Sequence, residues 1–350
     1  MEKGIVLKMV KVSKSQVISG LFYGGIVVLC LVVAIFIASL VTGVAIDESF
    51  GTFFSSTLGS VNGLLEVLKR TTPLLIASLG VAVAFRSGFW NIGAEGQIII
   101  GSIVTVGICL FLDIPAYLKI LFAFIASILA GGAYAGVAGF LKAKWDVNDI
   151  VITMMLNLVA FALLTYLLVG PWHWGTLYPR TEPIPVETRF PFIKYPLNST
   201  FILALILAFF AYFLIKKTVL GYKMRVVGDN PSAAACYGIN VKRTIMLAAV
   251  ISGGICALAG TSLVLGEFFR LQEGISAMYG FYAIAVALFA KNKPELIPFA
   301  ALLVAIVLVG TIGLSAAGMP RRFGEIVVGL LFIIVFLPVL LKRVKWLKGG

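Results

Sequence analysis

The stretch LFYGGIVVLCLVVAIFIASLVTGVAI, residues 21–46, runs for 26 residues without a charged side chain. A helix of that length, at about 1.5 Å per residue, crosses the roughly 30 Å hydrocarbon layer of a bilayer with some tilt. It is too long for the apolar core of a signal peptide, so we expect it to stay attached. This stretch therefore predicts a chain that spans a membrane.

The whole composition agrees with that prediction. Of 350 residues, 61% are hydrophobic and 12% are charged, which is about half the charge of a typical soluble domain. A soluble enzyme, a disordered chain and a collagen-like chain are excluded. The net charge is +13, but the basic residues lie in short segments between apolar runs. That distribution is typical of membrane topology, and we expect the lipid bilayer and no nucleic acid as a partner.

Further apolar runs follow along the chain. Seven are of full length and three are shorter, the full-length ones being 20–45, 118–141, 149–170, 199–215, 244–266, 296–316 and 324–341, and the shorter ones 74–85, 97–112 and 281–290. The shortest need extension by polar flanks, or they are broken helices buried in protein. We expect an all-α integral membrane protein with about ten transmembrane helices, some short or broken. Short runs in both halves predict an inverted repeat.

The basic residues predict the orientation. With ten spans and the N-terminus inside, 19 of the 28 Lys and Arg residues are cytoplasmic, so both termini are expected in the cytoplasm of a multi-pass cell-membrane protein. The expected organisation has a basic N-terminus, a transmembrane domain and a basic tail, at 1–19, 20–341 and 342–350. External loops are expected near 46–72, 170–198 and 267–280. The first should hold an amphipathic interfacial helix, and the second contains six of the 13 prolines.

The cytoplasmic segment 216–243 contains the pattern of a short, fully punctuated helix. Asn230 is a good N-cap, Pro231 suits the first helical position, and Gly238 suits the residue that ends the helix. A helix of about two turns outside the membrane has no role in spanning. It could dock into a groove of another protein, or it could be an ordinary cytoplasmic loop.

A second polar stretch, 85–97, separates two of the short runs. It is rich in glycine and places Asn91, Glu95 and Gln97 at close spacing. Such backbone is tolerated at membrane depth only where protein or a water-filled path lines it. Glu95 should have a partner there, with Arg86 the nearest in sequence, unless it lies in the headgroup region.

Several kinds of chemistry have no counterpart in the sequence. We find no constellation of catalytic residues, no phosphate-binding Walker A pattern and no paired cysteines, so we expect no catalytic residue and no metal site. No carboxylate or histidine lies in the middle of a spanning run. The energy for transport is therefore expected to come from another subunit. A stand-alone secondary transporter or facilitator is the alternative, and an intramembrane enzyme is the least supported reading.

Four stretches resemble a known family. They are TPLL (72–75) with FWNIGAEGQ (89–97), VNDI (147–150) with TMMLN (153–157), GDNP (228–231) with AA (233–234) and GI (238–239), and IAVAL (284–288). In this order they resemble permease subunits of bacterial and archaeal ABC importers of the ribose-permease-like superfamily. The nearest branch serves nucleosides and simple sugars together with basic-membrane-protein-type binding lipoproteins.

The resemblance implies a role and partners. The chain would pass a nucleoside or related simple sugar to the cytoplasm, and a separate ATP-binding subunit would hold ATP and Mg, with no cofactor on this chain. The other implied partners are a second permease, expected to be a shorter paralogue, and an extracytoplasmic substrate-binding lipoprotein. The implied ATPase-coupling residues are Asp229, Asn230, Pro231, Ala233, Ala234 and Gly238. The polar groups expected to line the substrate path are Asn91, Glu95, Gln97 and Asn157.

Overall fold

The computed structural model describes residues 45–316 and the isolated positions 32, 36, 39 and 329. The expected spans at 20–45 and 324–341 lie outside the described residues apart from those positions, as do both basic termini. Residues 55–309 form one compact unit, and the remaining described residues belong to a second one. All predicted site residues belong to the unit 55–309.

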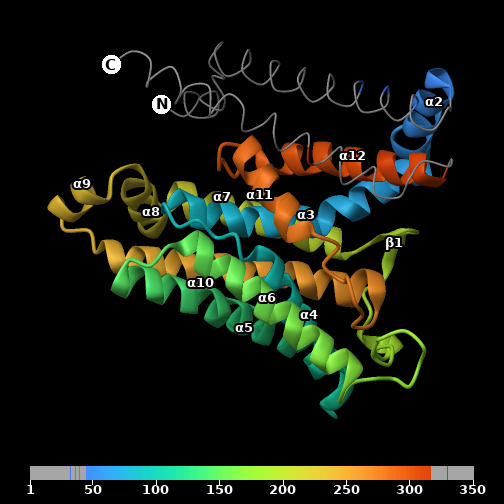
Figure 1. Ribbon diagram of the computed structural model, residues 1–350, viewed down its shortest axis with the longest axis horizontal. Coiled ribbons are helices and arrows are strands. Elements are labelled where there is room, and N and C mark those ends of the chain that lie inside the picture. The colour runs from blue at the N-terminus through green and yellow to red at the C-terminus, as the bar shows by residue number, and fades with distance from the viewer. Residues whose placement is uncertain (1–31, 33–35, 37–38, 40–44, 317–328, 330–350) are drawn as a thin grey trace, which may run out of the picture. The chain divides into compact units, whose positions relative to one another are not determined.

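The described chain is built almost entirely from helices (Figure 1). In chain order they are α2 (Ile46–Thr57), α3 (Val61–Arg86), α4 (Ala94–Phe111), α5 (Ala116–Trp145), α6 (Asp149–Val169), α7 (Thr200–Lys217), α8 (Val219–Asp229), α9 (Pro231–Cys236), α10 (Val241–Leu263), α11 (Tyr279–Phe289) and α12 (Ile297–Ala316). A π-helical turn, η3 (Val264–Phe268), continues α10. Between α6 and α7 lie a 3₁₀ turn, η2 (Val186–Thr188), and a hairpin of β1 (Phe192–Lys194) and β2 (Leu197–Asn198).

Every apolar run predicted within the described part of the chain forms a helix. Seven helices there are long and apolar enough to cross a membrane: α3, α4, α5, α6, α7, α12, and α10 together with η3. The run 281–290 forms α11, which at 11 residues and about 16 Å stays too short to cross alone. The prediction of an all-α membrane protein is therefore confirmed at this level.

Helix α3 decides between the two alternatives predicted for the run 74–85. The run 74–85 is extended by its polar flank, so that α3 covers 26 residues and is about 39 Å long. The Ser60 side chain caps its start by accepting the backbone N–H of Gly63 at 3.0 Å. Residues 61–72 are therefore helical and continuous with the run 74–85, and their predicted position at the membrane interface stays a prediction. Pro73 lies inside α3 without ending it.

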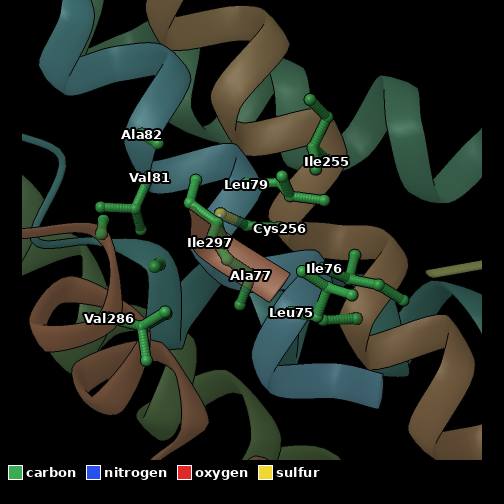
Figure 2. Packing of buried hydrophobic residues seen from close by; sticks show 14 of the residues in the cluster. Leu75, Ile76, Ala77, Leu79, Val81, Ala82, Ile255, Cys256, Val286 and Ile297 are labelled. Carbon is green, nitrogen blue, oxygen red and sulfur yellow. Dashed lines mark hydrogen bonds between the residues drawn. The ribbon is translucent and has the colours of Figure 1, made fainter. Parts of the chain in front are cut away.

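The core lies around α3 and α10, whose membrane-crossing parts are each 83% buried, whereas α6 is 22% buried. Figure 2 shows this packing, with Leu79 of α3 beside Ile255 and Cys256 of α10. The Cys256 thiol reaches the carbonyl of Ala77 at 3.5 Å. Helices α5, α6 and α7 carry large exposed apolar side chains on their outer faces, which suit contact with lipid or with another membrane subunit.

Small residues allow α5 and α10 to approach closely. A Cβ atom on Gly253 of α10 would collide with the carbonyl of Gly131 on α5, and one on Gly139 would collide with Ala249. Helices in membranes associate through such close backbone contacts. Helix α5 ends at Asp146, a left-handed residue whose pKa is held below its usual range by the ion pair with Lys142 at 2.8 Å.

Candidate functional site

The start of α9 has the predicted cap. The Asn230 side-chain oxygen accepts the backbone N–H of Ala233 at 3.0 Å, and Pro231 occupies the first helical position. An N-cap side chain satisfies one of the donors that a helix start leaves unpaired, and proline has no N–H to leave unpaired there. The sequence pattern therefore identified both the helix and its first residue.

The end of α9 is closed by Gly238, as predicted. Its φ of +75° lies in the left-handed region, which glycine adopts without a steric penalty. Its N–H donates to the carbonyl of Ala235 at 2.9 Å, and the N–H of Ile239 donates to that of Ala234 at 3.0 Å. These two bonds form the Schellman motif that ends many helices. Helix α9 thus has six residues between two specified ends.

Most of α9 and its flanks face outward. Only Ala234 is buried, and Ala233 is partly buried. The exposed residues are Asp229, Asn230, Pro231, Ser232, Ala235, Cys236, Tyr237 and Gly238. A capped helix with one small residue turned inward and the rest exposed is available for contact with another protein.

Helix α8 fixes α9 to the helical core. Its residues Gly221, Met224 and Val227 are buried on one face. At its end, a Cβ on Gly228 would collide with the carbonyl of Arg86, the last residue of α3. No side chain separates the two backbones there, so the end of α8 lies directly against the end of α3.

An amide in the loop after α3 and an amide of α4 bind each other. Asn91 donates to the side-chain oxygen of Gln97 at 2.9 Å, and Gln97 donates back to the oxygen of Asn91 at 2.9 Å. Asn91 also donates to the hydroxyl of Ser252 on α10 at 2.8 Å, and its oxygen accepts the N–H of Gly93 at 3.1 Å. Both amides are 1% exposed or less. The pair therefore joins the loop to α4 and α10.

Helix α6 binds the same loop with side chains spaced four residues apart. Asp149 accepts the backbone N–H of Trp90 at 2.6 Å, and Asn157 accepts that of Gly96 at 2.8 Å. The hydroxyl of Thr153, which lies between them on α6, accepts the backbone N–H of Ile92 at 3.2 Å. Residues at this spacing share one face of a helix. The sequence reasoning missed Asp149, Thr153 and Ser252, although the i, i+4, i+8 spacing of polar residues in α6 was a visible signal.

Glu95 lies where the start of α4 meets the start of α11. Its carboxylate accepts the backbone N–H of Gly280, the second residue of α11, at 2.7 Å. Its exposed fraction is 1%. An anion is stabilised at a helix N-terminus by unpaired N–H groups and by the helix dipole. Glu95 therefore caps α11 and is enclosed by protein.

The expected partner of Glu95 is corrected by this geometry. The guanidinium of Arg86 donates instead to the carbonyl of Asn292 at 2.8 Å, in the turn after α11. Arg86 ends α3, whereas Glu95 begins α4 after a loop that changes the chain direction, so nearness in sequence did not bring them together. Arg86 and Glu95 hold opposite ends of α11.

The structure brings all four predicted path residues into one buried region around the loop. Each makes hydrogen bonds within the chain, and none is more than 3% exposed. They are Asn91, Glu95, Gln97 and Asn157. This arrangement joins α3, α4, α6, α10 and α11, and it places no polar atom of the four on an open surface. Their function as lining of a substrate path stays a prediction.

The two later external loops predicted from the sequence lie together. The N–H of Thr181 donates to the carbonyl of Leu271 at 3.0 Å, and that of Ile184 to the carbonyl of Phe269 at 2.8 Å. The side chain of Arg189 lies over the ring of Phe269 at 5.0 Å. The segment 170–198 is therefore ordered, and it lies along the end of α10 that is farthest from α9.

The comparisons with known proteins agree with this architecture. The family of branched-chain amino acid transport system permease components matches residues 63–336. The chain belongs to this family. The permease is 30% identical to the glucose ABC transporter permease protein TsgB13 of Haloferax volcanii, over 85% of this chain and 82% of the relative.

Two bacterial relatives are equally similar. The permease is 30% identical to the guanosine ABC transporter permease protein NupP of Bacillus subtilis, over 85% of this chain and 87% of the relative. It is 31% identical to the nucleoside ABC transporter permease protein NupB of Lactococcus lactis, over 85% of this chain and 86% of the relative. The same two organisms have further relatives, the guanosine and nucleoside permease proteins NupQ and NupC. No solved structure matches.

The family and the helices establish the role at a general level. The protein is a multi-pass membrane protein and a permease subunit of an ABC transporter. It is a transport component and not an enzyme, because hydrolysis of ATP takes place on a separate subunit in such transporters.

Proposed function

We propose that the permease is the membrane-spanning subunit of an ATP-driven importer that passes a nucleoside or a related simple sugar from an external binding protein to the cytoplasm. The observation that carries the proposal is α9, a capped and exposed helix that is fixed through α8 to the end of α3. The substrate class is supported by relatives whose names specify guanosine, nucleosides and glucose.

The proposal includes a topology of ten spans with both termini in the cytoplasm and an inverted repeat. It is supported by the eight predicted apolar runs that form helices in the described residues. In this topology α9 is cytoplasmic, and the paired loops 170–198 and 267–280 are external.

Within this topology, α9 couples the permease to its ATPase. The proposed coupling residues are Asp229, Asn230, Pro231, Ala233, Ala234 and Gly238. The exposed ones among them would contact the ATPase, whereas the buried Ala234 would hold α9 in place. Rotation or closure of the ATPase would move α9 and, through the contact of Gly228 with Arg86, the end of α3. ATP and Mg would bind to the ATPase, and this chain would hold no cofactor.

Two further partners complete the transporter. A second permease subunit is supported by the pairing of NupP with NupQ and of NupB with NupC in single organisms. An extracytoplasmic binding lipoprotein would dock on the external loops, where Leu177, Tyr178 and Tyr195 are exposed.

The predicted path residues enter the proposal with a condition. Asn91, Glu95, Gln97 and Asn157 could meet substrate only in a state in which the loop 87–93 and the start of α4 have moved away from α6, α10 and α11. Such movement would break the bonds from Asn91 to Ser252, from Gly96 to Asn157 and from Gly280 to Glu95.

Purification of the permease from its native membrane, followed by an ATPase assay and by uptake into liposomes, tests the proposed function. We expect a stable complex with an ATPase, and hydrolysis stimulated by the binding protein loaded with nucleoside or sugar. A chain that purifies alone and moves solute without ATP would overturn the proposal in favour of a facilitator.

A further inference from the structure

Four charged side chains from two distant parts of the sequence form a cluster, which we call the α3–η3 cluster. Lys69 lies 3.3 Å from Glu66 and 3.3 Å from Glu267, and Arg70 lies 3.2 Å from Glu66 and 3.9 Å from Glu267. Arg70 also donates to the hydroxyl of Tyr279, the first residue of α11, at 3.2 Å. The cluster therefore joins α3, η3 and α11.

The cluster is mostly buried, and each of its side chains is partly exposed. The side chains of Lys69, Arg70 and Glu66 are 18%, 23% and 28% exposed, and that of Glu267 is 10% exposed. Charged groups beside a membrane-spanning segment are costly to keep in contact with lipid, so they face the protein interior or a water-filled cavity. An apolar cluster would pack this junction at less cost in desolvation. The charges therefore indicate a function beyond packing.

The backbone around the cluster is irregular. Helix α10 widens into the π turn η3 where Glu267 lies, and Phe269 follows with a φ of +55°. Ala277 and Met278, just before Tyr279, also have positive φ values, of 45° and 60°. Non-glycine residues rarely adopt this region, and both π turns and such strained residues occur often at functional sites. These features are independent of the ion pairs and point to the same place.

The cluster lies at the end of the permease where substrate would enter. From Val241 to Glu267, α10 and η3 are about 39 Å long, so Glu267 and α9 lie at opposite ends of the same helix. If α9 is cytoplasmic, as in the proposed function, the cluster is near the external surface. The segment that follows Phe269 pairs with the loop 170–198.

We propose that the α3–η3 cluster binds the hydroxyl groups of an uncharged sugar or nucleoside as it enters the path. This inference rests on the proposed function and names its substrate contacts. Two carboxylates and two cations give no net charge, so the cluster offers both acceptors and donors without favouring an anion or a cation. Carboxylate oxygens of Glu66 and Glu267 would accept substrate hydroxyls, while Lys69 and Arg70 hold those carboxylates in place. A phosphate group is bound by an excess of cations, which this neutral cluster does not supply.

Uptake by the complete transporter in liposomes tests this inference. The probes are labelled guanosine and glucose, each with its 2′- or 2-deoxy form, and guanosine monophosphate. The variant is Glu267→Gln, which preserves shape and removes the charge. The matched control is Asp146→Asn, which removes the carboxylate of the exposed pair with Lys142 and suits the left-handed backbone there.

We expect Glu267→Gln to reduce the preference for the hydroxylated substrate over its deoxy form about tenfold, because a site built to bind a hydroxyl rejects an analogue without it. Asp146→Asn should keep the wild-type preference, and guanosine monophosphate should not be transported. An unchanged preference in Glu267→Gln would overturn the inference, as would transport of the monophosphate. If the wild-type transporter accumulated none of the probes, the proposed function itself would fail.

A second variant covers the case in which Glu267→Gln does not assemble. Lys69→Met combined with Glu267→Gln removes one charge of each sign and keeps the cluster neutral. An assembled double variant with wild-type preference would assign the cluster a structural role and overturn the inference. An assembled double variant with a reduced preference would support it.

Discussion

The carboxylate of Glu95 accepts the backbone N–H of Gly280 at 2.7 Å, although 185 residues separate the two in the sequence. A Cβ on Gly280 would collide with the backbone of Glu95, so the N-termini of α4 and α11 touch directly. Tyr279, the residue before Gly280, accepts a hydrogen bond from Arg70 of the α3–η3 cluster. The first turn of α11 thus links the buried loop junction to the charged cluster.

Removing the Glu95 carboxylate should destabilise this junction. In Glu95→Ala, the N–H of Gly280 would be buried without its acceptor, which costs about 1–3 kcal/mol. Glu95→Gln keeps one acceptor oxygen and should lose less. Thermal unfolding of the purified permease in detergent measures the difference. Equal melting temperatures for Glu95→Ala and the wild type would contradict the capping role.

The Asn91 variant separates a structural role from a path-lining role. Asn91→Ala leaves Gln97 and Ser252 without their partner, and each buried polar group left unpaired costs about 1–3 kcal/mol. We expect a lower melting temperature, and an unchanged KM for uptake would remove Asn91 from the predicted path residues. A changed KM with an unchanged melting temperature would instead place Asn91 in the substrate path.

Gly238 offers a direct test of α9. Gly238→Val places a β-branched residue at a φ of +75°, which strains the turn by about 1–2 kcal/mol and opens the end of the helix. We expect weaker association with the ATPase in co-purification and slower ATP-dependent uptake. Gly238→Asn is the control, since asparagine tolerates the left-handed region, and it should retain most of the association.

Replacing Pro231 by tryptophan tests the same surface in a different way. The exposed first turn of α9 would become too large for a groove shaped to receive it, whereas the fold of the permease itself should be unaffected. The measurement is the amount of ATPase that co-purifies with a variant of normal melting temperature. Full association and transport would show that α9 is not the coupling helix.

The contact between α5 and α10 predicts a strict size limit at Gly253. Gly253→Ala should destabilise the permease by about 1–3 kcal/mol, because its Cβ would meet the carbonyl of Gly131 and the helices would have to separate. Gly136→Ala, on the α5 side of this contact, places a Cβ against only the Val250 side chain, so it should destabilise the permease much less. Melting temperatures of the two variants that differ by less than the error of the measurement would contradict the close packing.

The sequence by itself determined the features that depend on local chemistry. The apolar runs predicted the helices within the described residues because burial in lipid requires every backbone group to be paired within its own segment. Asn230, Pro231 and Gly238 predicted both ends of α9 because capping depends on residues only a few positions apart. The sequence left open whether the run before Arg86 is extended by its polar flank, because Lys69 and Arg70 in that flank find their partners elsewhere in the chain.

Only the tertiary structure decided which polar groups meet. Glu95 faces Gly280 and not Arg86, Asn91 faces Ser252 on α10, and Lys69 faces Glu267. These contacts depend on the direction in which each helix leaves its loop and on how closely glycines let the backbones approach. A single sequence contains no measure of either, because the energy of such contacts arises only after distant segments have packed together.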